Sequence, residues 1–118
     1  MEHTILVVED EQGIREAIGI YMKNQGYNVI LAANGKEGLE KIETNDIHLA
    51  IVDIMMPIMD GYEATLQIRK KDKKIPILAM SANAYMQDIQ KCYKAGMNGH
   101  ISKPLYLEDL KDRIIQIL

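Results

Sequence analysis

The sequence predicts an α/β fold built on a parallel sheet, and two observations carry the prediction. Five short apolar runs, each typical of a buried strand, alternate with stretches of helical periodicity. The runs lie near residues 4–8, 28–32, 49–53, 76–80 and 99–102. Connections between parallel strands are short and right-handed, so a strictly alternating order leaves little choice beyond a parallel sheet with helices on both faces.

Apolar periodicity and capping signals indicate five helices, one after each strand. The first helix has an apolar face made of Ile14, Ala17, Ile18, Tyr21 and Met22. The last has a similar stripe made of Leu107, Leu110, Ile114 and Ile117. Asn34 and Asp60 each precede a Glu by three residues, which is the spacing of a capping box at a helix start. The chain therefore reads as five βα units.

Two of the apolar strands end abruptly in carboxylates. Glu9 and Asp10 follow the run from Ile5 to Val8, and Asp53 follows the run from Leu49 to Val52. A doubly wound, flavodoxin-like sheet of order 2-1-3-4-5 would place these two strands side by side, with the acids at the edge where such sheets bind ligands. Crowded anions repel one another unless a cation lies between them, and a hard divalent ion such as Mg²⁺ is the natural candidate.

Two further strand ends bring a hydroxyl and an ammonium group to the same edge. Ser81 ends the fourth run and Lys103 follows the fifth. If Asp53, half enclosed and reachable, attacks phosphorus, Mg²⁺ and a lysine would neutralise the charge on the phosphoryl oxygens. Taken singly, each polar residue could be an ordinary helix cap or solvated loop residue. Taken together at four strand ends, they indicate a phosphoryl-transfer site.

Length, charge and cysteine content narrow the class of protein. The 118 residues suit a single domain over 1–118 with one core. A net charge of −3 gives no electrostatic footprint for nucleic acid or an anionic membrane. No apolar stretch approaches the ~20 residues of a membrane span and no signal segment begins the chain, so we expect a cytoplasmic location. The single cysteine, Cys92, excludes an internal disulfide, and its helical spacing favours packing.

The ordered set of motifs resembles the CheY-like receiver domain of two-component response regulators. The residues that carry this resemblance are Glu9-Asp10, Asp53, Ser81 and Lys103-Pro104, with Met56-Pro57 and Asp60-Gly61 after the acceptor position. The match covers nearly the whole chain. It implies a phosphoacceptor signalling domain of a phosphorelay, not an enzyme acting on external substrates.

The resemblance also implies individual roles at the acidic edge. Asp53 would accept the phosphoryl group, Asp10 would bind Mg²⁺ or Mn²⁺ directly, and Glu9 would act largely through metal-bound water. Met55 would contribute its backbone carbonyl to the metal. Lys103 would pair with the phosphoryl group.

A conformational switch is a further implication of the resemblance. Ser81 would move toward the phosphoryl group while a ring three residues before the lysine turns inward. That ring position is His100, where the family more often has Tyr or Phe. Imidazole is smaller, polar and able to titrate near neutrality. The alternative that this histidine only packs at the strand end, without switching, therefore stays open.

The expected partners follow from the same resemblance. The segments 81–84 and 95–100 look most like receivers carried by hybrid sensor histidine kinases. Such a receiver takes its phosphoryl group from a sensor histidine kinase or exchanges it with a histidine phosphotransfer protein, without a DNA-binding output of its own. The expected docking face is the first helix with the loop after the fifth strand, around Ile14, Ile18 and Pro104-Leu105. A phosphorylation-dependent dimer is also compatible with the resemblance.

Three other functions are weighed against this one. A haloacid-dehalogenase-like phosphatase also uses a strand-end Asp with Mg²⁺, but its general acid two residues later is here Met55. A flavodoxin-like FMN binder needs a phosphate loop after the first strand, where Glu9, Asp10 and Glu11 would repel a phosphate. A degenerate receiver would act only as an interaction module, which the complete set of acids and Lys103 disfavours.

Overall fold

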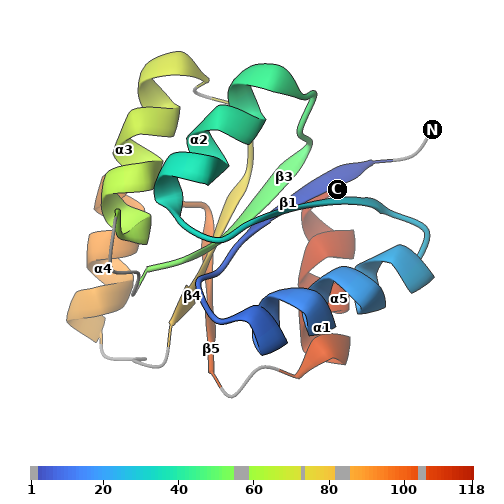
Figure 1. Ribbon diagram of the computed structural model, residues 1–118. Coiled ribbons are helices and arrows are strands. Elements are labelled where there is room, and N and C mark those ends of the chain that lie inside the picture. Colours follow the sequence, from blue (N-terminus) through green and yellow to red (C-terminus); the bar gives the residue numbers. More distant parts are fainter. Residues whose placement is uncertain (1–2, 55–58, 73, 82–85, 104–105) are drawn as a thin grey trace.

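Five parallel strands form one sheet in the order β2-β1-β3-β4-β5, with five helices packed against it (Figure 1). The structure is a computed structural model that describes residues 3–54, 59–72, 74–81, 86–103 and 106–118. The strands are β1 (Thr4–Val8), β2 (Asn28–Ala32), β3 (Leu49–Asp53), β4 (Ile77–Ser81) and β5 (Gly99–Ser102). The helices are α1 (Gln12–Asn24), α2 (Gly35–Thr44), α3 (Gly61–Lys71), α4 (Met86–Ala95) and α5 (Leu107–Ile117). The predicted fold class and strand order are confirmed.

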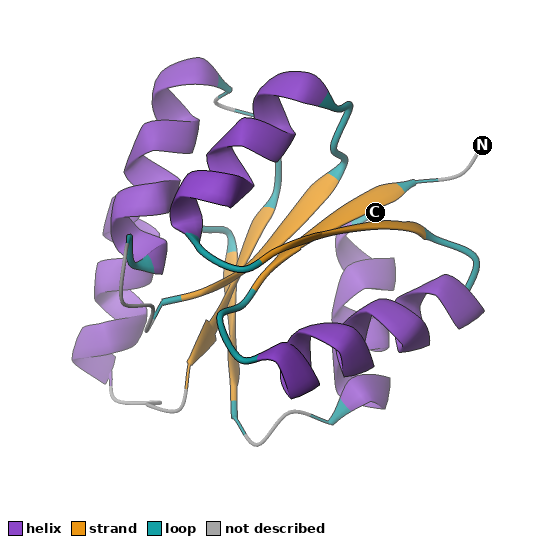
Figure 2. Ribbon diagram, viewed as in Figure 1, coloured by secondary structure: helices purple, strands orange, loops and turns teal. Residues whose placement is uncertain are grey.

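The helices form two layers, one on each face of the sheet. Figures 1 and 2 show α1 and α5 on one face and α2, α3 and α4 on the other. Side chains alternate between the two faces along a strand. Leu6 and Val8 therefore pack toward α2 and α3, while Ile5 and Val7 pack toward α1 and α5. Both faces of the central strands are buried, which is why those strands read as continuous apolar runs.

Strand register brings the carboxyl ends of β1 and β3 level. Val8 of β1 pairs with Val52 of β3, so the next residues, Glu9 and Asp53, lie level at the ends of the two strands. On the other side of β3, Asp53 pairs with Met80 of β4. The register, and not only the strand order, therefore assembles the acidic edge.

Local signals in the sequence are confirmed at the helix starts and corrected on one helix face. The side chains of Asn34 and Asp60 each accept a hydrogen bond from the backbone N–H three residues later, as capping requires. On α1, Ile18 is buried as predicted, but Ala17 is exposed and Gly19 is buried beside Leu31 of β2. The face is centred one position from the prediction because β2 covers one flank of the helix.

Each helix in the described part of the chain is too short or too polar to cross a bilayer.

Candidate functional site

Three carboxylates meet at the carboxyl edge of the sheet. Glu9, Asp10 and Asp53 each offer an oxygen, and these oxygens lie within 4.8 Å of one another. Glu9 follows β1 and its N–H donates to the Ala32 carbonyl at 3.1 Å, which extends the ladder with β2. Asp53 is the last residue of β3. The predicted convergence of these acids is therefore present.

The two acids inside the edge are enclosed, while Asp10 is exposed. Glu9 is 0% exposed and Asp53 is 1% exposed. The sequence predicted a half-enclosed Asp53, and that prediction is wrong. Asp53 still belongs to the sheet, where it pairs with Met80 of β4, and the backbone of Gly61 lies against its carbonyl.

Lys103 bridges the two enclosed acids. Its Nζ donates to Glu9 Oε1 at 2.8 Å and to Asp53 Oδ2 at 3.2 Å. The segment that carries it is fixed by the Lys103 N–H, which donates to the Ser81 carbonyl at 2.7 Å. Buried charges are costly unless they are paired, so the Lys103 ammonium group compensates the negative charge of Glu9 and Asp53. The contact with Asp53 fits the predicted site, whereas the contact with Glu9 was not foreseen.

The pKa values of Glu9 and Lys103 reflect this crowding of charged groups. Burial raises the pKa of Glu9 from 4.5 to about 8, and the neighbouring Asp53 adds to the rise while Lys103 opposes it. Burial by itself would lower the pKa of Lys103, but its hydrogen bond to Glu9 and the charge of Asp53 outweigh that effect and raise it. One ammonium group therefore leaves the site short of positive charge.

The donor set fits a hard divalent cation. Glu9 Oε2 is buried and has no hydrogen-bond partner among the described residues, so one enclosed oxygen is left to be satisfied. Carboxylate oxygens are the ligands that Mg²⁺ prefers, and they suit Mn²⁺ as well. Glu9, Asp10 and Asp53 are the residues that could hold such an ion. The predicted contribution of Met55 falls outside the described residues.

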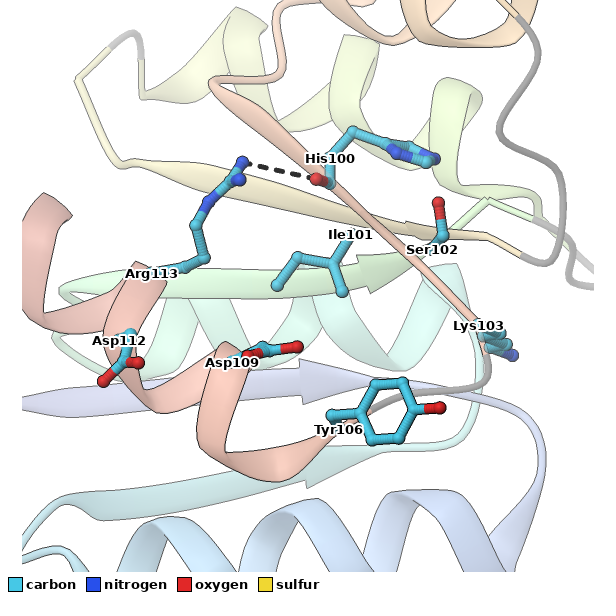
Figure 3. Close-up of a pocket in the computed structure, with 8 residues that line it drawn as sticks. All are labelled: His100, Ile101, Ser102, Lys103, Tyr106, Asp109, Asp112 and Arg113. Carbon is cyan, nitrogen blue, oxygen red and sulfur yellow. Dashed lines mark hydrogen bonds between the residues drawn. The ribbon is translucent and has the colours of Figure 1, made fainter.

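Ser81 and His100 occupy the neighbouring strands. Ser81 is the last residue of β4 and is fully buried. His100 is half-buried on β5, opposite Ala79, and therefore faces the α3 and α4 layer to which Ala79 packs. Figure 3 shows His100 and Ile101 on opposite sides of β5, with Arg113 of α5 donating to the His100 carbonyl at 3.3 Å. Ser81 thus lies at the edge, whereas His100 lies two residues before the end of β5.

A surface groove borders the outer side of Lys103, between β5 and α5 (Figure 3). The residues that line it are His100, Ile101, Ser102, Lys103, Tyr106, Asp109, Asp112 and Arg113. Lys103 is thus reachable from this groove while its ammonium group contacts the buried acids. The groove had no counterpart in the sequence prediction.

The predicted docking face is corrected in part. Ile18 is 0% exposed and belongs to the core beneath α1, so it offers no contact surface. Ile14 is half-buried against the same core. Ile20, which was not singled out, is a large apolar residue that α1 exposes, at 62%. Pro104 and Leu105 fall outside the described residues.

Gly61 supports the site in a way that sequence reasoning missed. A Cβ at this position would lie 2.6 Å from the Asp53 carbonyl oxygen and 2.7 Å from the Ile54 Cα. The sequence indicated only that Asp60-Gly61 begins a helix. The signal that could have revealed the close approach is a glycine at a first helical position, a place that does not by itself require one.

Family comparison agrees with this geometry. The model of the response regulator receiver domain matches residues 5–115. The chain therefore belongs to the response regulator receiver domain family, whose members are signalling domains of two-component systems.

Two relatives that the chain matches are much longer than the chain itself. The cyclic di-GMP phosphodiesterase of Thermotoga maritima is 38% identical over 98% of this chain and 31% of its own length. The sensor histidine kinase RcsC of Salmonella typhi is 34% identical over 93% of this chain and 12% of its own length. The chain spans a minor part of both proteins.

Solved structures match over nearly the whole chain. The chemotaxis protein CheY4 of Vibrio cholerae has a TM-score of 0.97 at 28% identity, with 100% of both chains covered. The response regulator TrrA of Thermotoga maritima, in complex with Mg²⁺ and BeF, has a TM-score of 0.89 at 31% identity, covering 98% of this chain and 99% of that one.

Proposed function

We propose that this domain accepts a phosphoryl group on Asp53 from a phosphohistidine, with Mg²⁺ at the acidic edge. The observation that carries the proposal is the position of Lys103. Its ammonium group contacts Asp53 at 3.2 Å, and carboxylate oxygens of Glu9, Asp10 and Asp53 lie within 4.8 Å of one another. A positive charge beside a nucleophilic carboxylate, with a cation site next to it, suits phosphoryl transfer.

The proposed reaction is a balanced exchange of one bond for another. An Asp53 carboxylate oxygen attacks phosphorus, the O–P bond forms, and the P–N bond to the donor imidazole breaks. The leaving imidazole takes a proton from solvent, and the product is an acyl phosphate on Asp53. Bound Mg²⁺ would supply charge neutralisation on the phosphoryl oxygens. Lys103 would follow the new negative charge and loosen its contact with Glu9.

The proposed readout uses the strands on either side of the acceptor. The Ser81 hydroxyl, at the end of β4, would bond a phosphoryl oxygen. His100 lies on the neighbouring strand and on the face toward α3 and α4, so movement of the β4 end would reach its ring. The proposal is supported by the pairing of β4 with β5 and by the position of His100 on the sheet face toward α3 and α4.

The proposed donor is a sensor histidine kinase, or a histidine phosphotransfer protein acting as donor or acceptor. The match to a sensor histidine kinase supports a receiver carried by a hybrid kinase, although it covers a small part of that protein. The phosphodiesterase match equally supports a receiver that controls an attached output domain. Phosphorylation-dependent dimerisation is a further form that the output could take.

The competing functions have weaker support. A phosphatase acting on external substrates needs a general acid near the nucleophile, and Met55 at the expected position carries no proton to donate. A domain that only binds partners would not need an ammonium group held between two buried acids. Phosphoacceptance therefore accounts for more of the site.

A beryllofluoride titration followed by amide NMR tests the proposal. With Mg²⁺ present, we expect shifts at Asp53, Ser81 and Lys103, because beryllofluoride mimics a phosphoryl group on a carboxylate. The matched control is Asp46→Asn, which alters an acid whose side chain is 92% exposed and should leave the shifts intact. Asp53→Asn should abolish them. Absence of Mg²⁺-dependent shifts in the parent protein would overturn the proposal.

A further inference from the structure

Arg15 reaches back from α1 to the segment that carries two of the acids. Its Nη1 donates to the Glu9 carbonyl at 2.8 Å and, more weakly, to the Asp10 carbonyl at 3.4 Å. These are successive carbonyls of the connection between β1 and α1, whose course is visible in Figure 1. One guanidinium nitrogen therefore holds two adjacent peptide planes.

The same connection has few other restraints in the described part of the chain. The Glu9 N–H is tied to the Ala32 carbonyl, which fixes the strand side. On the helix side, the N-cap residue Glu11 makes no capping hydrogen bond through its side chain. Asp10 lies between these points and is exposed, so packing does not orient it. The direction of its carboxylate therefore depends on the peptide planes that Arg15 holds.

We propose that Arg15 is a positioning residue for the divalent cation. By fixing the Glu9 and Asp10 carbonyls, it directs both side chains toward Asp53 and keeps their oxygens within the 4.8 Å cluster. The inference rests on the proposed function, since it assigns a role toward the ion that the proposed reaction uses. The hydrogen bonds of Arg15 go to backbone carbonyls, so it acts on the site through the backbone.

Charge and positioning make opposite predictions for the loss of this side chain. A guanidinium at the Glu9–Asp10 backbone repels an incoming cation, so a purely electrostatic role means that its removal tightens Mg²⁺ binding. A positioning role means that its removal weakens binding, because groups that orient metal ligands typically contribute 10–100-fold to affinity. Arg15 is only half-buried, so we expect the lower end of this range, about tenfold. The sign of the change separates the two roles.

The test is a Mg²⁺ titration followed by amide NMR on the parent protein, Arg15→Gln, Arg15→Lys and Arg113→Gln. Arg113 is the matched control, because its guanidinium also donates to a backbone carbonyl, that of His100 on β5, and not to the segment that carries Glu9 and Asp10. We expect Arg15→Gln to raise the dissociation constant about tenfold. Arg15→Lys keeps the charge without the planar donor and should weaken binding by a smaller factor. Arg113→Gln should leave it unchanged.

Each result decides the inference. Unchanged or tighter binding in Arg15→Gln would overturn it, as would equal weakening in Arg113→Gln. If Arg15→Gln does not fold, Arg15→Lys decides, and affinity identical to the parent would count against a role for the guanidinium. If the parent itself does not bind Mg²⁺, the proposed function falls together with the inference, whereas a parent that binds beside unaffected variants removes the inference alone.

Discussion

Gly61→Ala should destabilise the domain through the acceptor strand. The new Cβ would lie 2.6 Å from the Asp53 carbonyl oxygen, 2.7 Å from the Ile54 Cα and 3.0 Å from the Asp53 carbonyl carbon. All three are backbone atoms, so no flexible side chain can give way. Either α3 or the end of β3 must shift. We therefore place the cost in the upper half of the range for overpacking, at about 2–3 kcal/mol.

The assay is thermal unfolding followed by circular dichroism. An unfolding entropy of about 2.1 cal/mol/K per residue makes 1 kcal/mol worth roughly 4 °C in a domain of this length, so the midpoint should fall by about 8–12 °C. Gly13→Ala is the matched control, because nothing lies within 4 Å of its Cβ position on α1. Alanine is a better helix former than glycine, so the control should be neutral or slightly stabilised.

Equal midpoints for Gly61→Ala and the parent protein would refute this reasoning. That result would mean that the β3 end yields freely, and that Asp53 is not held in place by the start of α3. A loss of stability in Gly13→Ala of the same size would instead show that the glycine exchange itself is costly in this fold. The pair of variants therefore isolates the contact at Asp53.

Two further predictions concern the acid at β1 and the core beneath α1. Because the pKa of Glu9 is raised from 4.5 to about 8, the folded protein holds a proton between these values that the unfolded chain has released. Urea unfolding without divalent cations should therefore show a free energy of unfolding that falls from pH 4.5 to pH 8. The Glu9→Gln variant should lose this pH dependence. A free energy of unfolding that rises over the same interval would contradict the prediction. Ile18→Ala should cost about 2–5 kcal/mol and Ile20→Ala less than about 0.5 kcal/mol, because Ile18 is 0% and Ile20 is 62% exposed; equal urea midpoints would contradict the assigned burial.

The fold was predictable because its elements are strongly patterned. The three central strands are short, apolar and buried on both faces, and right-handed crossovers restrict how alternating strands and helices connect. Capping residues such as Asn34 and Asp60 marked helix starts correctly. The fourth strand, predicted near 76–80, is observed at Ile77–Ser81, so a single position separates the two. Periodicity and end signals locate elements this closely.

The details of the site were less predictable, because they depend on the reach of long side chains and on the approach of backbones. The strand ends placed Glu9 and Asp53 together, but the length and direction of Lys103 decide that it bridges both. Arg15 was not singled out in the sequence, because its bonds to the preceding connection depend on how α1 leaves β1. Gly61 reads as a helix start until the distance to β3 is known. These are tertiary contacts, and they leave no periodic pattern in the sequence from which they could be predicted.

The central claim, that Asp53 accepts the phosphoryl group, is tested most directly by intact mass after incubation with Mg²⁺ and acetyl phosphate. We predict the addition of one phosphoryl group, its removal by hydroxylamine as expected for an acyl phosphate, and no addition to Asp53→Asn. Asp46→Asn, which changes an exposed acid away from the cluster, should be modified like the parent. Modification that persists in Asp53→Asn, or a parent protein that takes up no phosphoryl group, would contradict the account.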